Sequence, residues 1–133
     1  MKEALLDTDT LINFFKKDTE TLIKTKKCLS EFDVFSISDI SYFEFLKGLE
    51  FRGSLNKKII FDIFVEENKL IRMSKESIKI SASVYADLRK QGITIGTADL
   101  LIAGIAIHSD MELITNNQAH FRQIKDLKLN NWK

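Results

Sequence analysis

The stretch from Ala4 to Phe15 constrains the fold more than any other part of the chain. It begins as a short apolar run, stops at an acidic, hydroxyl-rich turn, and resumes with apolar residues at helical spacing, which is the pattern of a buried strand, a tight turn and a helix. A strand that leads directly into a helix opens a βα unit, and ligands bind in such units where strands end and helices begin. The carboxylates of Asp7 and Asp9 are costly there unless a positive charge faces them, so we expect a divalent cation at this turn.

Strands and helices alternate along the rest of the chain. Strands are predicted at 2–7, 34–37, 69–73 and 112–115, with a small edge strand at 127–129. Helices are predicted at 10–15, 18–31, 39–52, 59–64, 75–90 and 98–108, with a short one within 116–121. This alternation predicts a single domain over 1–133, a three-layer α/β/α fold around a central, mostly parallel sheet of four or five strands. The helix over 98–108 is apolar on all sides, so it should be buried.

Composition limits the class of protein. The 133 residues are 44% hydrophobic and 29% charged, as expected for one soluble globular domain. The net charge of +1 predicts no broad polyanion-binding surface, so a nucleic acid would bind at a local site or through metal ions. A single cysteine, Cys28, excludes an internal disulfide. No apolar run is long enough for a membrane span and no signal-like start is present, so we expect a cytoplasmic protein with no membrane contact.

Polar side chains recur at the ends of predicted strands or in the helices that follow. They are Asp7 with Asp9, Glu44, Asp99, and the turn 115–117. Because parallel strands end at one edge of a sheet, we expect these groups to meet there. Their oxygen ligands would select a hard cation, Mg²⁺ or Mn²⁺, and such a site suits attack of water on a phosphodiester. The histidines, His108 and His120, have no partners at zinc-ligand spacing.

Each candidate also has a purely structural explanation. Thr8 or Asp9 could cap the first helix. Glu44 follows Ser41 at the spacing of a capping box. Asp99 lies in the first turn of its predicted helix, after a predicted Thr97 cap, where the helix dipole favours a carboxylate. The asparagine at 117 could be an ordinary turn residue.

The ordered set of motifs resembles the PIN-domain family and, within it, the VapC-type toxins of bacterial toxin–antitoxin pairs. The resemblance rests on Leu5–Asp9, Tyr42–Gly48, Thr97–Ala106 and Leu113–Asn117, followed by His120-Phe121. Each motif alone is weak, whereas their order and intervals are fairly specific and cover essentially the whole chain.

The resemblance implies an endoribonuclease that depends on Mg²⁺ or Mn²⁺. Its principal acidic residues, catalytic and metal-binding, would be Asp7, Glu44 and Asp99. Asp9 is a further candidate ligand, and Asn117 stands where many members have an aspartate. Its carbonyl oxygen can still accept a metal contact or orient a water molecule.

Other implications concern the surroundings of the site and the partners. Thr8, Thr115 and Asn116 would hold the ligands in place. The toxin branch implies an RNA substrate whose cleavage blocks translation, a homodimer, and an antitoxin that plugs the site with a C-terminal segment. DNA would be reached only through that antitoxin.

The aromatic residues are unevenly distributed. Seven of the ten phenylalanines lie between positions 32 and 64. Helices within 39–67 could therefore leave an apolar groove for an amphipathic segment of the antitoxin. The alternative is that these side chains fill the core, which we expect for at least half of them.

Two other functions are compatible with parts of this pattern. A phosphatase of the haloacid dehalogenase type would share an Asp7-Thr8-Asp9 nucleophile motif, but it needs a lysine and paired acids after the second motif. Positions 116–133 contain no acidic pair. The other alternative is a catalytically inactive PIN domain that binds RNA or protein, and the presence of Asp7, Glu44 and Asp99 counts against it.

Overall fold

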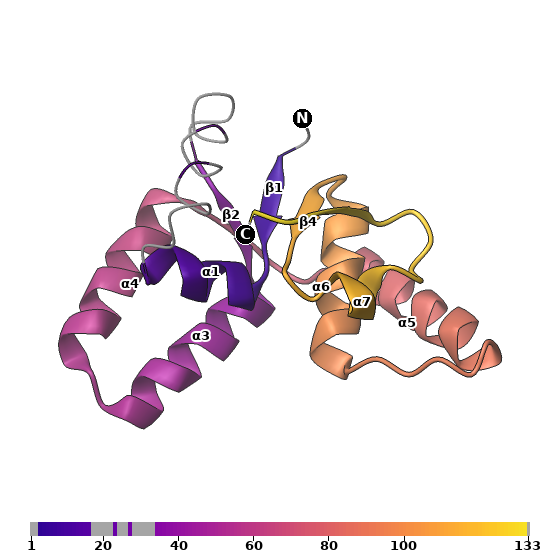
Figure 1. Cartoon of the computed structure of the whole chain (residues 1–133), viewed down its shortest axis with the longest axis horizontal. Coiled ribbons are helices and arrows are strands. Elements are labelled where there is room, and N and C mark those ends of the chain that lie inside the picture. Colours follow the sequence, from indigo (N-terminus) through magenta and orange to yellow (C-terminus); the bar gives the residue numbers. More distant parts are fainter. Residues whose placement is uncertain (1–2, 17–22, 24–26, 28–33, 133) are drawn as a thin grey trace.

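The computed structural model describes residues 3–16, 23, 27 and 34–132 (Figure 1). Its centre is a five-stranded sheet in the order β3-β2-β1-β4-β5, in which every neighbouring pair is parallel. The strands are β1 (Ala4–Leu6), β2 (Ser36–Ser38), β3 (Lys69–Ile71), β4 (Glu112–Ile114) and β5 (Lys128–Asn130). The parallel sheet is confirmed, although most of its strands are shorter than predicted, and the small edge strand is present as β5.

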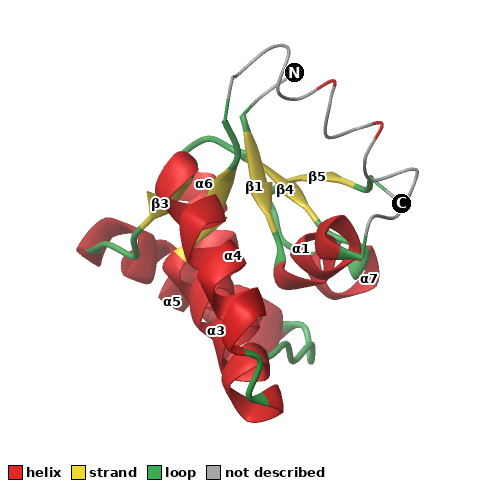
Figure 2. Cartoon of the chain, turned by 90° about the vertical axis from the view of Figure 1, so that its left-hand side faces the viewer, coloured by secondary structure: helices red, strands yellow, loops and turns green. Residues whose placement is uncertain are grey.

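Helices cover both faces of this sheet. They are α1 (Thr8–Phe15), α3 (Asp39–Arg52), α4 (Leu55–Glu67), α5 (Lys75–Lys90), α6 (Thr97–His108) and α7 (Gln118–Phe121). Figures 1 and 2 show α3 and α4 on one side of the strands and α5 and α6 on the other. The predicted three-layer α/β/α class is therefore confirmed. The helix expected over 18–31, together with Cys28, falls almost wholly outside the described residues.

The central strand β1 is buried on both faces, and its successive side chains point to opposite faces of the sheet. Leu5 packs into one core cluster with residues of α5 and α6. Ala4 and Leu6 pack into a second cluster with Leu11 and Phe35. This period of two is the geometry of a strand, and covered faces are typical of parallel sheets. The strand thus fixes where the chain turns, immediately before the acidic residues.

Aromatic rings fill the second cluster. Rings of α1, α3 and α4 meet there, with centroids 5.1 Å apart for Phe15 and Phe64 and 4.4 Å apart for Phe45 and Phe61. Six of the seven phenylalanines within 32–64 are described, and four of them belong to this ring cluster: Phe35, Phe45, Phe61 and Phe64. Phe43 and Phe51 are instead 61% and 94% exposed. Most of the described phenylalanines in this range therefore fill the core, which confirms the expectation that at least half of them do so.

The helix ends follow local chemistry. Ser38 caps α3, and Gly53 ends it in the left-handed conformation with φ of 67°. Ser74 caps α5, whose predicted range of 75–90 is confirmed. The predicted Thr97 cap of α6 is wrong, because Gly96 holds the cap position and Thr97 is the first helical residue. None of the helices in the described ranges is long and apolar enough to span a membrane.

The close packing of α5 on α6 depends on Gly104. The Ser81 hydroxyl lies 2.8 Å from the Leu100 carbonyl oxygen and 3.1 Å from that of Ser77, so it links the two helices. A methyl group at Gly104 would overlap the Ser81 hydroxyl and the Ser77 carbonyl oxygen. The predicted burial of α6 is confirmed, and its position against α5 depends on this absence of a side chain.

We expect Gly104→Ala to lower the free energy of unfolding by about 1–3 kcal/mol, because it overfills a packed interface. Gly48→Ala is the matched control, since its new methyl group would meet only the flexible end of Arg52, at 3.4 Å. Alanine is favoured over glycine within a helix by roughly 0.5–1 kcal/mol, so this control should be neutral or stabilising. Urea unfolding of both variants measures the contrast, and equal effects would contradict the packing explanation.

Candidate functional site

Four acidic side chains from three separate segments gather at the carboxyl edge of the sheet. Asp7 and Asp9 flank the start of α1, Glu44 lies in α3, and Asp99 lies in the first turn of α6. They are close enough for their charges to act on one another: Asp9 and Asp99 destabilise the charged form of Asp7, and Glu44 and Asp9 do the same to Asp99. The structure therefore brings together carboxylates that are up to 92 positions apart in the sequence.

Asp7 is the most buried of these acids, with 5% of its surface exposed. One carboxylate oxygen accepts the Thr8 backbone N–H at 2.8 Å, and the other accepts the Thr115 hydroxyl at 2.8 Å. Burial and the charge of Asp9 raise the pKa of Asp7 from 3.8 to about 6, against the opposing effect of these two hydrogen bonds. Asp7 is also the N-cap of α1, so the suggestion that Thr8 or Asp9 caps this helix is wrong.

Asp9 is held from β4 and the turn after it. Its Oδ2 atom accepts the Asn116 backbone N–H at 3.0 Å, and the Thr115 hydroxyl lies 3.4 Å away. The contact of the Thr115 hydroxyl with Asp7, at 2.8 Å, is the shorter of its two contacts with the acids. Thr10 fixes the same region by donating its hydroxyl to the Ile114 carbonyl oxygen at 2.9 Å.

Glu44 is tied to α1 by a short hydrogen bond. The Thr8 hydroxyl donates to its Oε1 atom at 2.7 Å. The capping-box explanation for Glu44 is wrong, because Ser38 is the N-cap of α3 and its hydroxyl accepts the Ser41 backbone N–H. Glu44 lies in the second turn, where it faces the start of α1. Thr8 thus contacts two acids, Asp7 through its backbone and Glu44 through its side chain.

Asp99 faces His120, one of the two histidines without partners at zinc-ligand spacing. Its Oδ2 atom lies 3.3 Å from Nδ1 of His120, which belongs to α7. Burial raises the pKa of Asp99, the hydrogen bond and charge of His120 oppose that rise, and Glu44 and Asp9 add to it. Zinc-ligand spacing along the chain could not reveal this contact, because the two residues pair as single side chains across two helices.

The side chain of Asn117 takes no part in the hydrogen bonds that hold the acids. It occupies the N-cap position of α7, its side chain makes no capping hydrogen bond, and it is exposed. Its backbone N–H donates to the Thr115 hydroxyl oxygen at 3.1 Å. The main chain at position 117 thus supports Thr115 in its contact with Asp7.

Within the described ranges, no three His, Cys, Asp or Glu side chains are grouped closely enough to hold one metal ion by themselves. Protein-only coordination is the exception for Mg²⁺, which keeps several waters and binds one or two carboxylates together with substrate phosphates. The oxygen-only donor set and the crowding of negative charge fit a hydrated ion of this kind.

The raised pKa of Asp7 predicts a pH-dependent stability in metal-free protein. Because its folded pKa of about 6 exceeds 3.8, proton binding favours the folded state. This stabilisation is complete below pH 3.8 and disappears as the pH rises through 6. Between pH 4 and pH 7 we expect the free energy of unfolding of Asp7→Asn to rise relative to wild type by up to about 3 kcal/mol, the value that corresponds to the rise of this pKa from 3.8 to about 6.

Denaturant unfolding at several pH values in a chelating buffer measures this difference. Asp87→Asn on the exposed surface of α5 is the matched control and should follow the wild-type curve. Parallel curves for Asp7→Asn and wild type would contradict the assignment of the pH dependence to Asp7.

The chain is similar to known proteins over nearly its whole length. The PIN domain family model matches residues 4–127. Ribonuclease VapC1 of Methanocaldococcus jannaschii is 32% identical over 127 residues, covering 96% of this chain and 85% of its own. Ribonuclease VapC2 of Rickettsia felis is 28% identical over 129 residues, covering 96% of both chains.

A solved structure agrees with these sequence matches. It contains VapBC2 from Rickettsia felis bound to a DNA fragment from their promoter, and it superimposes with a TM-score of 0.84 at 27% identity. The superposition covers 98% of each chain. Sequence and structure therefore agree on one family over nearly the whole chain.

Proposed function

This chain belongs to the PIN-domain family, and from that premise we propose that it is a metal-dependent endoribonuclease, the toxin of a type II toxin–antitoxin pair that blocks translation. Two relatives that match almost its full length are named ribonucleases. The observation that supports the proposal most is the crowding of four carboxylates at one edge of the sheet. An RNA substrate implies that the protein works in the cytoplasm.

We assign Asp7, Glu44 and Asp99 as the metal-binding and catalytic acids, with Asp9 and Asn117 as further candidate ligands. Mg²⁺, or Mn²⁺, fits because every candidate donor is an oxygen. The ion would lower the pKa of a bound water molecule and stabilise the leaving oxygen of the phosphodiester. Apart from the charge, the chain's own contribution is to hold the acids in place before the substrate binds.

Hydroxyl and amide groups do this holding. Thr8 fixes Glu44 at 2.7 Å, Thr115 fixes Asp7 at 2.8 Å, and the Asn116 N–H fixes Asp9 at 3.0 Å. Asp7 is shielded from water, whereas the side chain of Asp99 is 27% exposed. Asp9 and Glu44 are also partly exposed, so we propose that the scissile phosphate approaches from the side of these three acids rather than from that of Asp7.

We expect Asp7→Asn and Asp99→Asn to abolish Mg²⁺-dependent cleavage of RNA while leaving the fold intact. Each change removes a negative charge and keeps the side-chain shape. Cleavage of total cellular RNA with Mg²⁺ and with a chelator is the measurement, circular dichroism checks the fold, and Asp87→Asn is the active control. Full activity of either variant would remove that residue from the site.

The same assay separates the alternatives. A phosphatase would release inorganic phosphate from a small phosphoester and leave RNA intact, and the PIN-domain match over 4–127 favours the nuclease instead. An inactive binding module would retain RNA without cutting it under any metal condition.

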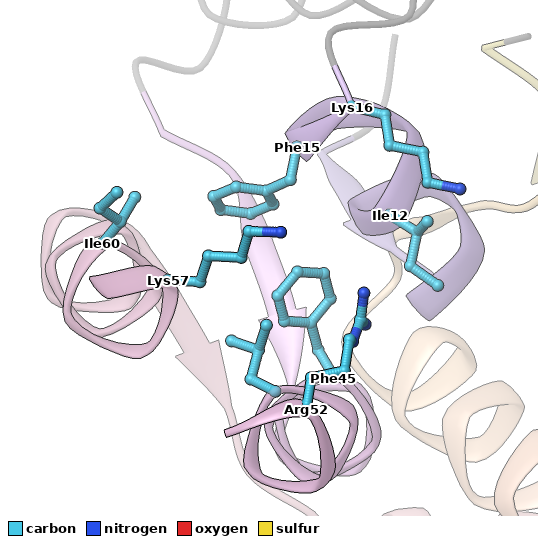
Figure 3. A pocket seen from close by; sticks show the side chains of 8 residues that line it. Ile12, Phe15, Lys16, Phe45, Arg52, Lys57 and Ile60 are labelled. Atoms are coloured by element: carbon cyan, nitrogen blue, oxygen red, sulfur yellow. The ribbon is translucent and has the colours of Figure 1, made fainter. Parts of the chain in front are cut away.

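An apolar groove suits the proposed antitoxin. It has a volume of about 360 Å³ and lies among α1, α3 and α4 (Figure 3). The lining residues are Ile12, Phe15, Lys16, Phe45, Leu49, Arg52, Lys57 and Ile60. Five of these residues are aromatic or aliphatic, and the other three carry a positive charge. We propose that a C-terminal antitoxin segment with an apolar anchor and flanking acidic residues occupies this groove.

Figure 3 shows Lys57 extending from α4 toward the rings of Phe15 and Phe45. The fold neighbour from Rickettsia felis was solved as VapBC2 on promoter DNA, and we propose by analogy that this chain reaches DNA only through its antitoxin. The homodimer that the family implies stays a prediction.

We expect Lys57→Glu to weaken capture of the protein encoded by the adjacent reading frame without lowering RNA cleavage, because it places a negative charge beside an acidic partner. Lys79→Glu on the exposed surface of α5 is the matched control. Co-purification and RNA cleavage are measured on the same preparations. Equal capture by both variants would exclude the groove as the docking site.

A further inference from the structure

One short segment contacts three of the four acids. Between β4 and the end of α7, the Thr115 hydroxyl donates to Asp7, the Asn116 N–H donates to Asp9, and the His120 ring meets Asp99. The first two contacts are typical hydrogen bonds of 2.8 and 3.0 Å from groups with no charge. The third, at 3.3 Å, comes from the one residue of this segment that can carry a positive charge.

The contact is not a by-product of core packing. The His120 side chain is 59% exposed, so its burial contributes little to folding. Its backbone, in contrast, is fixed: the next residue, Phe121, is fully buried, and the His120 N–H donates to the Asn117 carbonyl oxygen at 3.0 Å. A rigid turn therefore holds an exposed imidazole against Asp99.

Asp99 needs such a partner more than its neighbours do. It lies in the first turn of α6, whose N-cap Gly96 offers no side-chain hydrogen bond. The carboxylates of Glu44 and Asp9 repel it, and partial burial removes part of its hydration. In the described part of the chain, the His120 ring is the side chain within hydrogen-bonding distance of this carboxylate.

We propose that His120 is a positioning residue that holds the Asp99 carboxylate through Nδ1, leaving the second carboxylate oxygen free for the metal ion of the proposed nuclease. This inference rests on the proposed function. Partners that orient a metal-binding carboxylate are worth about 10–100-fold in metal affinity or activity. The relevant feature is a hydrogen-bond donor at one position, and no proton transfer is assigned to the ring.

The geometry of the ring gives a selective test. The side-chain nitrogen of asparagine can occupy the place of Nδ1, so His120→Asn keeps the donor, whereas His120→Ala removes it. His108 is the matched control, because it is exposed, is the only other histidine and lies at the opposite end of α6. Nine residues of helix separate it from Asp99, a distance of roughly 14 Å.

The experiment measures Mn²⁺ affinity from the paramagnetic resonance signal of the free ion, alongside kcat and KM for RNA cleavage at saturating Mn²⁺. We expect His120→Ala to bind Mn²⁺ about 10–100-fold more weakly. His120→Asn should recover most of that loss, and His108→Ala should match wild type. The KM for RNA should stay unchanged in all variants, and their thermal unfolding should coincide.

Three results would overturn the inference. Unchanged Mn²⁺ affinity in His120→Ala would show that Asp99 needs no support from the ring. A raised KM with unchanged Mn²⁺ affinity would assign His120 to RNA binding, and a loss of kcat that asparagine does not restore would assign it to the reaction itself. Wild-type protein that neither binds Mn²⁺ nor cleaves RNA would instead overturn the proposed function.

Discussion

Repulsion among carboxylates at the edge of the sheet is the constraint that the rest of the structure accommodates. Burial and like charge both disfavour ionised Asp7, and its pKa rises to about 6. The fold tolerates this because donors come from elements that have other reasons to be there. Thr115 directly follows the buried strand β4, and Thr8 begins a helix. The cost is concentrated in one place, where a cation would relieve it.

The sheet explains why these residues meet at all. β1 is buried on both faces and pairs with β2 on one side and β4 on the other, so the chain turns at the same level after each strand. Asp99 does not follow a strand but lies in the first turn of α6. Its position depends on how closely α6 packs on α5, and the small residues Gly104 and Ser81 set that approach. The position of Asp99 can therefore depend on a glycine that lies five positions further along the same helix.

Much of the fold, and the positions of the acidic residues, could be predicted from the sequence. The apolar run before Asp7 identified the central strand, and the alternation of elements identified the layers, because both patterns are set by local periodicity. The order of the acidic motifs gave the family. Contacts between single side chains on different helices could not be predicted in this way. His120 has no partner at zinc-ligand spacing in the sequence, yet its ring lies 3.3 Å from Asp99 in the fold.

The N-cap residues of α1 and α6 were also predicted wrongly from the sequence. Capping depends on which residue leaves the helical conformation, and several neighbours compete for that position. At the start of α1 the N-cap is Asp7 rather than Thr8 or Asp9. Thr8 is therefore the first helical residue, and its hydroxyl donates to Glu44. A shift of one residue at a cap thus decides whether a side chain closes a helix or holds an acid.

Helix α1 links the site to the groove. Thr8 at its first position holds Glu44, while Ile12 and Phe15, one and two turns later, line the groove. The eight residues of α1 span about 12 Å, a distance that an extended peptide covers in roughly four residues. A segment anchored in the groove is therefore long enough, with a few further residues, to reach the acids. Any basic group on that extension would meet uncompensated negative charge, so one short peptide could close both surfaces at once.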